Sequence, residues 1–178
     1  MTSVRELGQL LTAESGLTKA DIENRLLILT RAGVLPRSQR GRGASTPLED
    51  GHIADVLLSL LSPEAKESAE WAARLGALTY VDPTNGETSI LKDFLISMLG
   101  ASSDKEQLSL YRVRRMLSRC HPEKPYVDID VGIKRRQTLR MIFAEQPNLD
   151  TEDTLIDRSV VISGRIFPLL ADFLWGDE

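Results

Sequence analysis

The sequence is poor in several features that would assign a class at once. It holds one cysteine, Cys120, in 178 residues, so no disulfide can form within the chain. Its longest apolar stretch, residues 53–61, is interrupted by Asp55 and Ser59, whereas a membrane-spanning helix needs about 20 apolar residues. The start, "MTSVRELGQLLTAESG", holds acids and no long apolar segment, so no signal peptide is expected. We therefore expect a cytoplasmic protein of bacterial type without a membrane partner.

The sequence also lacks the common signatures of catalysis and cofactor binding. No G-x-x-x-x-G-K-[ST] phosphate loop and no G-x-S-x-G nucleophile motif is present. One cysteine and two distant histidines, His52 and His121, do not suit a zinc site. Cys120 and His121 are neighbours, and adjacent residues of a strand point to opposite faces, so a thiol–imidazole pair is not expected. We predict no enzymatic activity, no metal and no cofactor.

One pair of acids keeps a metal site open as an alternative. Asp128 and Asp130 alternate along a predicted strand, which would place two carboxylates on one face, and divalent cations prefer oxygen ligands. No third acid or histidine is obvious nearby. We favour the polar face of an ordinary strand.

Acidic residues are absent between Asn24 and Leu48, although the whole chain has a net charge of −4. Residues 105–140 are also basic, with ten Lys/Arg against four Asp/Glu, whereas residues 49–104 hold three against ten and residues 141–178 hold two against eight. Such asymmetry indicates a local site for a polyanion. Ordinary variation among solvated faces is the alternative, which we favour for residues 105–140 but not for residues 25–48.

Hydrophobic periodicity predicts helices over residues 2–15 and 19–33. Ser3 and Glu6 have the spacing of a capping box, Thr18 suits the N-cap of the second helix, and Gly33 suits its C-cap. Pro36 prevents the helix from continuing into the Arg- and Gly-rich segment that follows. Further helices are predicted over residues 46–62, 63–78 and 89–100.

Beyond about residue 105 the pattern changes to alternation, which predicts strands over residues 126–132, 137–145 and 157–163. Residues 108–119 suit a strand or a helix, and we favour a strand because a turn and a clear strand follow. A helix beginning at Ser163 is predicted to close the chain. The expected fold class is α+β, with an N-terminal helical unit at 1–62 and a second unit at 63–178 that holds helices, a small antiparallel sheet and the last helix.

The order of elements in residues 3–62 is that of a winged helix-turn-helix unit. In such a unit the second helix enters the major groove of DNA, and the loop that follows contacts phosphates or the minor groove. Arginine makes charge-assisted hydrogen bonds to phosphate, and glycine lets the backbone approach the duplex. The predicted DNA contacts are Thr18, Lys19, Glu23, Asn24, Arg25, Arg31, Arg37, Ser38, Gln39, Arg40 and Arg42.

This stretch resembles the N-terminal domain of MerR-type regulators. The matching pieces are "REL" at residues 5–7, "RAGVLP" at residues 31–36 and the Arg/Gly loop at 37–45, about a third of the chain. The family's usual aromatic pair is replaced by Ile28 and Leu29, and no long dimerisation helix follows. The resemblance therefore implies DNA binding and not the family's effector chemistry. The whole chain is also similar to uncharacterised regulators of alphaproteobacterial prophages and gene-transfer elements.

Two functions follow from these observations. The first is a sequence-specific transcription regulator that binds double-stranded DNA as a homodimer or higher homo-oligomer. The second is a phage-type packaging or accessory protein whose oligomer contacts DNA. Because a lone helix-turn-helix reads few base pairs, a pairing surface is expected, and the apolar C-terminal helix is the best candidate. A second regulatory or transcription protein is another possible partner.

Overall fold

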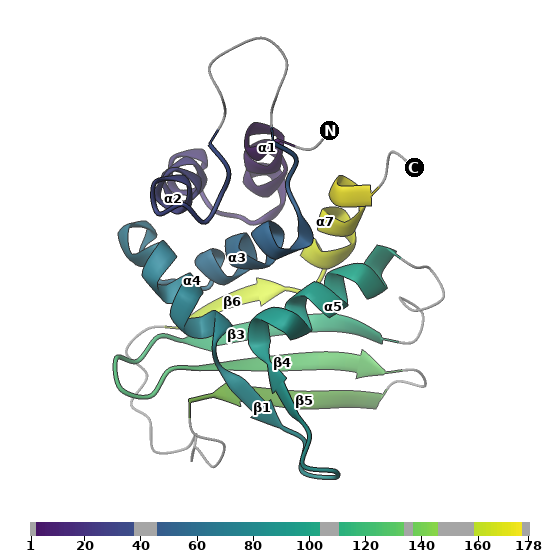
Figure 1. The fold of residues 1–178 in the computed structure, drawn as a ribbon. Coiled ribbons are helices and arrows are strands. Elements are labelled where there is room, and N and C mark those ends of the chain that lie inside the picture. Colours follow the sequence, from purple (N-terminus) through teal and green to yellow (C-terminus); the bar gives the residue numbers. More distant parts are fainter. Residues whose placement is uncertain (1–2, 38–45, 104–110, 134–136, 146–158, 176–178) are drawn as a thin grey trace.

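The computed structural model describes residues 3–37, 46–103, 111–133, 137–145 and 159–175. It has the predicted α+β fold, with helices stacked on one face of a six-stranded antiparallel sheet (Figure 1). Helices α1 and α2 form the layer farthest from the sheet, and α3 lies between them and the sheet (Figure 1). Helix α3, most of whose residues are buried, therefore lies between these N-terminal helices and the sheet.

The first two helices begin and end where local chemistry predicts. Helix α1, Val4–Glu14, has the predicted capping box, in which the Ser3 hydroxyl accepts from the Glu6 amide at 3.3 Å and the Glu6 carboxylate accepts from the Ser3 amide at 2.8 Å. Helix α2, Lys19–Arg31, is capped by Thr18, whose hydroxyl accepts from the Asp21 amide at 3.2 Å. Gly33 has a φ of +78°, the left-handed conformation that glycine adopts just after a helix.

The predicted helix over residues 63–78 is wrong in its details. Helix α3 spans Asp50–Leu60, a short 3-10 helix spans Ala65–Glu67, and α4 spans Ser68–Gly76. Residues Thr79–Val81 then form strand β1, which pairs with β2, Thr88–Ile90, in a hairpin. Strands of three residues are too short for alternation to stand out, so only their turn, with Gly86 at a φ of +75°, was visible in the sequence.

Helix α5 also departs from its predicted bounds. It spans Leu91–Ser103 and so begins later than residue 89, because β2 occupies that position, and it continues through Gly100. A methyl group added at Gly100 would meet no atom within 4 Å, so this glycine is not required by a turn or a close approach. Helix α7, Ile166–Trp175, begins after the predicted Ser163 because that residue ends a strand.

The predicted strands after residue 105 are present, including the ambiguous one. They are β3, Tyr111–Arg119, β4, Tyr126–Ile133, β5, Gln137–Ala144, and β6, Ser159–Ser163. The order across the sheet is β2-β1-β5-β4-β3-β6. In the β3–β4 pair the register shifts between Val113 and Arg115, which leaves Arg114 as a bulge.

Buried residues from both predicted units belong to one hydrophobic cluster, which reaches from Leu7 in α1 to Leu170 in α7. Polar contacts also cross the predicted boundary at 62/63. The Ser118 hydroxyl of β3 donates to the Leu61 carbonyl at 2.6 Å, and Lys92 Nζ lies 2.8 Å from Asp55 Oδ1. The division into two units stays a prediction, and its two parts share a core in this structure.

Helix α7 is attached to the same core. Ile166, Phe167, Leu170 and Ala171 are buried, while Phe173, Leu174 and Trp175 are partly buried against the cluster. Much of the apolar content that suggested a pairing surface is therefore used within the chain. That α7 joins subunits stays a prediction.

Candidate nucleic-acid interface

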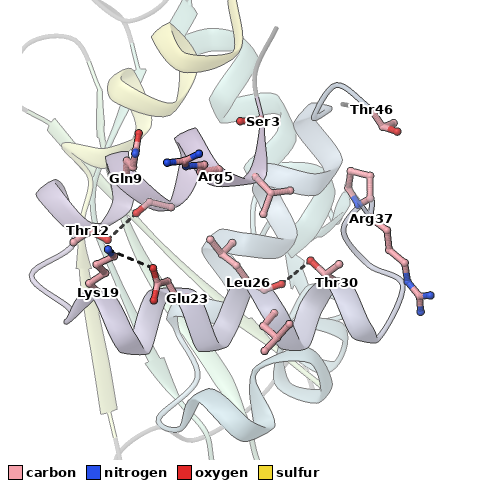
Figure 2. A pocket seen from close by; sticks show the side chains of 14 residues that line it. Ser3, Arg5, Gln9, Thr12, Lys19, Glu23, Leu26, Thr30, Arg37 and Thr46 are labelled. Atoms are coloured by element: carbon pink, nitrogen blue, oxygen red, sulfur yellow. Dashed lines mark hydrogen bonds and ion pairs between the residues drawn. The ribbon is translucent and has the colours of Figure 1, made fainter. Parts of the chain in front are cut away.

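A groove of about 750 Å³ lies between α1 and α2 (Figure 2). Its lining combines apolar side chains with hydroxyl groups, charged side chains and one amide, that of Gln9. The lining residues are Ser3, Val4, Arg5, Gly8, Gln9, Thr12, Lys19, Glu23, Leu26, Leu27, Thr30, Pro36, Arg37 and Thr46. Three of these side chains are cationic and one is anionic, so the groove favours an anionic ligand over a cationic one.

The described residues that flank the Arg/Gly segment lie at this groove. Arg37 and Thr46 are the last described residues on either side of residues 38–45, and both line the groove. Figure 2 shows Arg37 extending away from the two helices. The predicted contacts Ser38, Gln39, Arg40 and Arg42 lie outside the described residues. The fold thus connects this basic segment directly to the α1–α2 surface.

Two predicted contacts of α2 lie on the groove. Lys19 and Glu23 are exposed and form an i,i+4 ion pair of 3.7 Å, with side chains 75% and 64% exposed (Figure 2). An exposed pair of this kind contributes little to stability. Both side chains therefore remain available to a partner at little energetic cost.

The other exposed contacts of this helix do not line the groove. Thr18, Asn24 and Arg31 are exposed, but Thr18 already uses its hydroxyl as the N-cap of α2. Asn24 and Arg31 lie outside the groove lining. The structure therefore places Lys19, Glu23 and Arg37 along one groove, with Arg37 at the opposite end from Lys19 (Figure 2), and leaves Asn24 and Arg31 outside it.

Arg25 does not lie on this surface, contrary to the sequence prediction. Only 4% of it is exposed, its Nε donates to Asp21 Oδ2 at 2.7 Å, and its Nη1 donates to the carbonyl of Ser59 in α3. The guanidinium joins α2 to the end of α3 and has no access to a phosphate. We leave Arg25 out of the proposed interface.

Sequence reasoning missed three exposed groove residues, Arg5, Gln9 and Thr46. Arg5 belongs to the "REL" triplet that carried the family resemblance, but its place beside α2 depends on how the helices pack. The hydroxyls of Thr12 and Thr30 also line the groove. They donate to the carbonyls of Gly8 and Leu26, each at 2.7 Å, and are thereby partly used within their own helices.

The acids considered for a metal are paired with arginines. Asp128 Oδ2 accepts from Arg140 Nη2 at 2.7 Å, and Asp130 Oδ2 lies 2.9 Å from Arg115 Nη2. No group of three or more metal-ligating side chains that could hold an ion occurs in the described part of the chain.

Cys120 and His121 have different hydrogen-bond partners and do not contact each other as a thiol–imidazole pair. Cys120 is buried and its Sγ lies 3.5 Å from the Leu61 carbonyl, and burial raises the pKa of its thiol to about 11. The neighbouring His121 accepts from the amides of Glu123 and Lys124, each at 3.2 Å. A thiol with a raised pKa is mostly protonated near neutral pH and is a weak nucleophile.

Among the described residues, no helix combines the length and apolar character that a membrane crossing requires. Comparison of the chain with models of protein families, with curated proteins and with solved structures gave no match. The resemblance to MerR-type regulators therefore depends on the residues quoted above, and the function is argued from the α1–α2 surface itself.

Proposed function

We propose that the protein is a sequence-specific DNA-binding regulator of phage or mobile-element type, which contacts double-stranded DNA through α2 and the Arg/Gly segment. The observation that carries this proposal is that Arg37 and Thr46, the described residues that flank residues 38–45, line the same groove as Lys19 and Glu23 of α2. A winged helix-turn-helix unit needs this arrangement, with a basic loop next to the reading helix.

Charge and exposure support the same assignment. Arg5, Lys19 and Arg37 surround the groove and can position phosphates. Lys19, Glu23 and Asn24 are exposed in the first half of α2, the part of a reading helix that approaches base edges. The resemblance to MerR-type regulators points to the same two elements.

The proposal is tested by selecting binding sites from random double-stranded DNA with the purified chain. A recurrent motif, with a solution mass of a dimer or tetramer, would support a regulator. An enriched pool without a motif, or no binding at all at low salt, would contradict it. A ring of eight or more subunits would favour the packaging alternative.

Arginines of the loop should supply affinity that does not depend on sequence. Each phosphate contact releases about one counterion, so each arginine lost should reduce the slope of log affinity against log salt by roughly 0.9. We expect the triple change of Arg37, Arg40 and Arg42 to alanine to weaken binding to every duplex. Fluorescence anisotropy over a salt series would measure this, and an unchanged slope would refute the role of the loop.

Asn24 should contribute to base recognition. Asparagine pairs with adenine through two hydrogen bonds, which discriminate against other bases by about 1–3 kcal/mol. We expect Asn24→Ala to relax the selected motif at one base pair per half-site while non-specific affinity stays nearly constant. Asn85→Ala, in the distant β1–β2 turn, is the matched control. A motif that Asn24→Ala leaves unchanged would count against α2 as the reading helix.

A further inference from the structure

The sheet has one face that no described helix covers (Figure 1). On the covered face, Met116, Val127, Ile129 and Phe143 are buried in the core. Side chains directly opposite on paired strands point to the same face, and successive side chains alternate. The register pairs Arg115 with Asp130, and Asp130 with Arg140. These three residues therefore form one cross-strand row on the open face.

Strand β3 carries further arginines on this open face. Arg112 pairs with Gly132, and Arg119 pairs with Tyr126. Gly132 and Tyr126 lie two and four residues from Asp130 on β4, so they are on the same face of the sheet as Asp130. The bulge adds Arg114, whose Nε would lie 2.6 Å from a methyl group placed on Gly132. Bulges re-aim side chains in this way. Of the residues that the structure describes, the open face thus gathers Arg112, Arg114, Arg115, Arg119 and Arg140, with the acids Asp128 and Asp130.

Two of these arginines are held in place by the acids. Asp128 is 5% exposed, and both of its oxygens accept from Arg140 Nε at 3.0 Å. These hydrogen bonds and the charge of Asp128 raise the pKa of Arg140 above its usual value. A guanidinium has five N–H donors, so Arg140 and Arg115 keep donors for a ligand while their orientation is fixed. Arg119 is also oriented, with its guanidinium 5.1 Å from the centre of the Tyr126 ring.

Arg112 and Arg114 are exposed, and neither has an ion pair among the described residues. Among the described residues of this face, five cationic side chains outnumber two carboxylates, within a chain whose net charge is −4. Fixed guanidinium groups in excess over acids suit phosphate oxygens, to which arginine makes strong charge-assisted hydrogen bonds.

We propose that the open face of β3, β4 and β5 binds the phosphate backbone of double-stranded DNA, as a second surface besides α1 and α2. A duplex fits better than a single strand because binding of single strands relies on aromatic side chains that stack with bases. The described aromatic side chain on this face, Tyr126, is 2% exposed. The contact would carry no sequence information, because phosphates are the same at every base pair.

The two surfaces lie on opposite sides of the molecule, since α1 and α2 form the layer farthest from the sheet (Figure 1). One chain would then hold two duplexes, or two segments of one. This inference does not depend on base recognition by α2. The 105–140 region, whose positive charge the sequence alone did not distinguish from ordinary variation, acquires a role because the sheet gathers five of its arginines on one face.

The test compares Arg112→Gln/Arg114→Gln with Lys66→Gln/Arg74→Gln, which removes the same charge on and near α4. Binding of a labelled random-sequence 24-base-pair duplex is measured by anisotropy over a salt series, with thermal unfolding as a check of the fold. We expect the sheet-face variant to bind more weakly, with a slope of log affinity against log salt smaller by about 1.8, at roughly 0.9 for each contact. The control variant should behave as the original chain does.

Further variants separate this inference from the proposed function. Lys19→Gln/Arg37→Gln tests the helical surface on the same duplex, and the combination of both pairs should show additive losses, because the sites are distant. If only the helical variant loses affinity, the sheet surface is refuted and the proposed function stands. If only the sheet-face variant loses affinity, the sheet surface stands and the proposed DNA contact of the helical surface is refuted. A sheet-face variant that changes solution mass but not DNA affinity would show that this face binds protein, which would also overturn the inference.

Discussion

Replacing Gly164 with alanine should lower the free energy of unfolding by at least about 3 kcal/mol. Gly164 follows β6 and donates from its amide to the Arg114 carbonyl at 2.9 Å. A methyl group there would lie 1.9 Å from the Val113 carbonyl oxygen and 2.4 Å from its carbon. Overpacking against side chains costs about 1–3 kcal/mol, and here the obstacle is backbone, which cannot rotate away.

Gly132→Ala is the matched control for Gly164→Ala. A methyl group at Gly132 would first meet Arg114 Nε at 2.6 Å, the far part of an exposed side chain that can rotate away. We expect this variant to lose less than about 1 kcal/mol. Urea unfolding followed by circular dichroism would compare the two. Equal losses for both variants would mean that the close approach of Gly164 to the β3 bulge is not what requires glycine.

Arg25→Ala should cost about 3 kcal/mol in the free energy of unfolding. The change leaves Asp21 without its cation and the Ser59 carbonyl without this donor, and it removes a buried side chain between α2 and α3. Breaking a buried ion pair from one side costs about 3–5 kcal/mol. We expect the lower end of this range because the Asp21 side chain is 30% exposed, so water can partly solvate the carboxylate that is left unpaired. Denaturant unfolding measures the loss.

Two comparisons make the Arg25 prediction specific. Arg31→Ala removes an exposed arginine from the same helix, and we expect a change within about 0.5 kcal/mol. Adding Asp21→Asn to Arg25→Ala should cost less than the sum of the two single changes, because the double variant no longer leaves an unpaired carboxylate. Strict additivity, or a large loss in Arg31→Ala, would contradict the assigned role of Arg25.

The effect of Arg25 also bears on function. Its hydrogen bond to Ser59 joins the proposed reading helix to α3, which packs on the rest of the core. A variant that loosens this contact should bind DNA with lower affinity even though Arg25 has no place on the surface. Loss of DNA binding in an Arg25 variant is therefore no sign of direct contact unless its stability is measured as well.

The sequence by itself determined the features that depend on neighbouring residues. The capping box at Ser3 and Glu6, the N-cap at Thr18 and the left-handed Gly33 follow from local hydrogen bonding and backbone sterics. Strand β4 was visible because its alternation is strict over seven residues. The α+β class followed from where helical periodicity gives way to alternation. These signals act over one or two turns or a few strand residues, so they survive without knowledge of the fold.

Only the tertiary structure decided which charged residues reach the surface and which meet one another. Arg25 and Asn24 are adjacent and both polar, yet α3 covers the first and leaves the second exposed. The arginines of β3 and β5 share a face because antiparallel pairing through β4 places them in one row. Burial and register arise from contacts between segments far apart in the chain, and a local pattern does not contain them. For this reason residues 105–140 looked like an ordinary basic stretch in the sequence and form an arginine-rich surface in the folded protein.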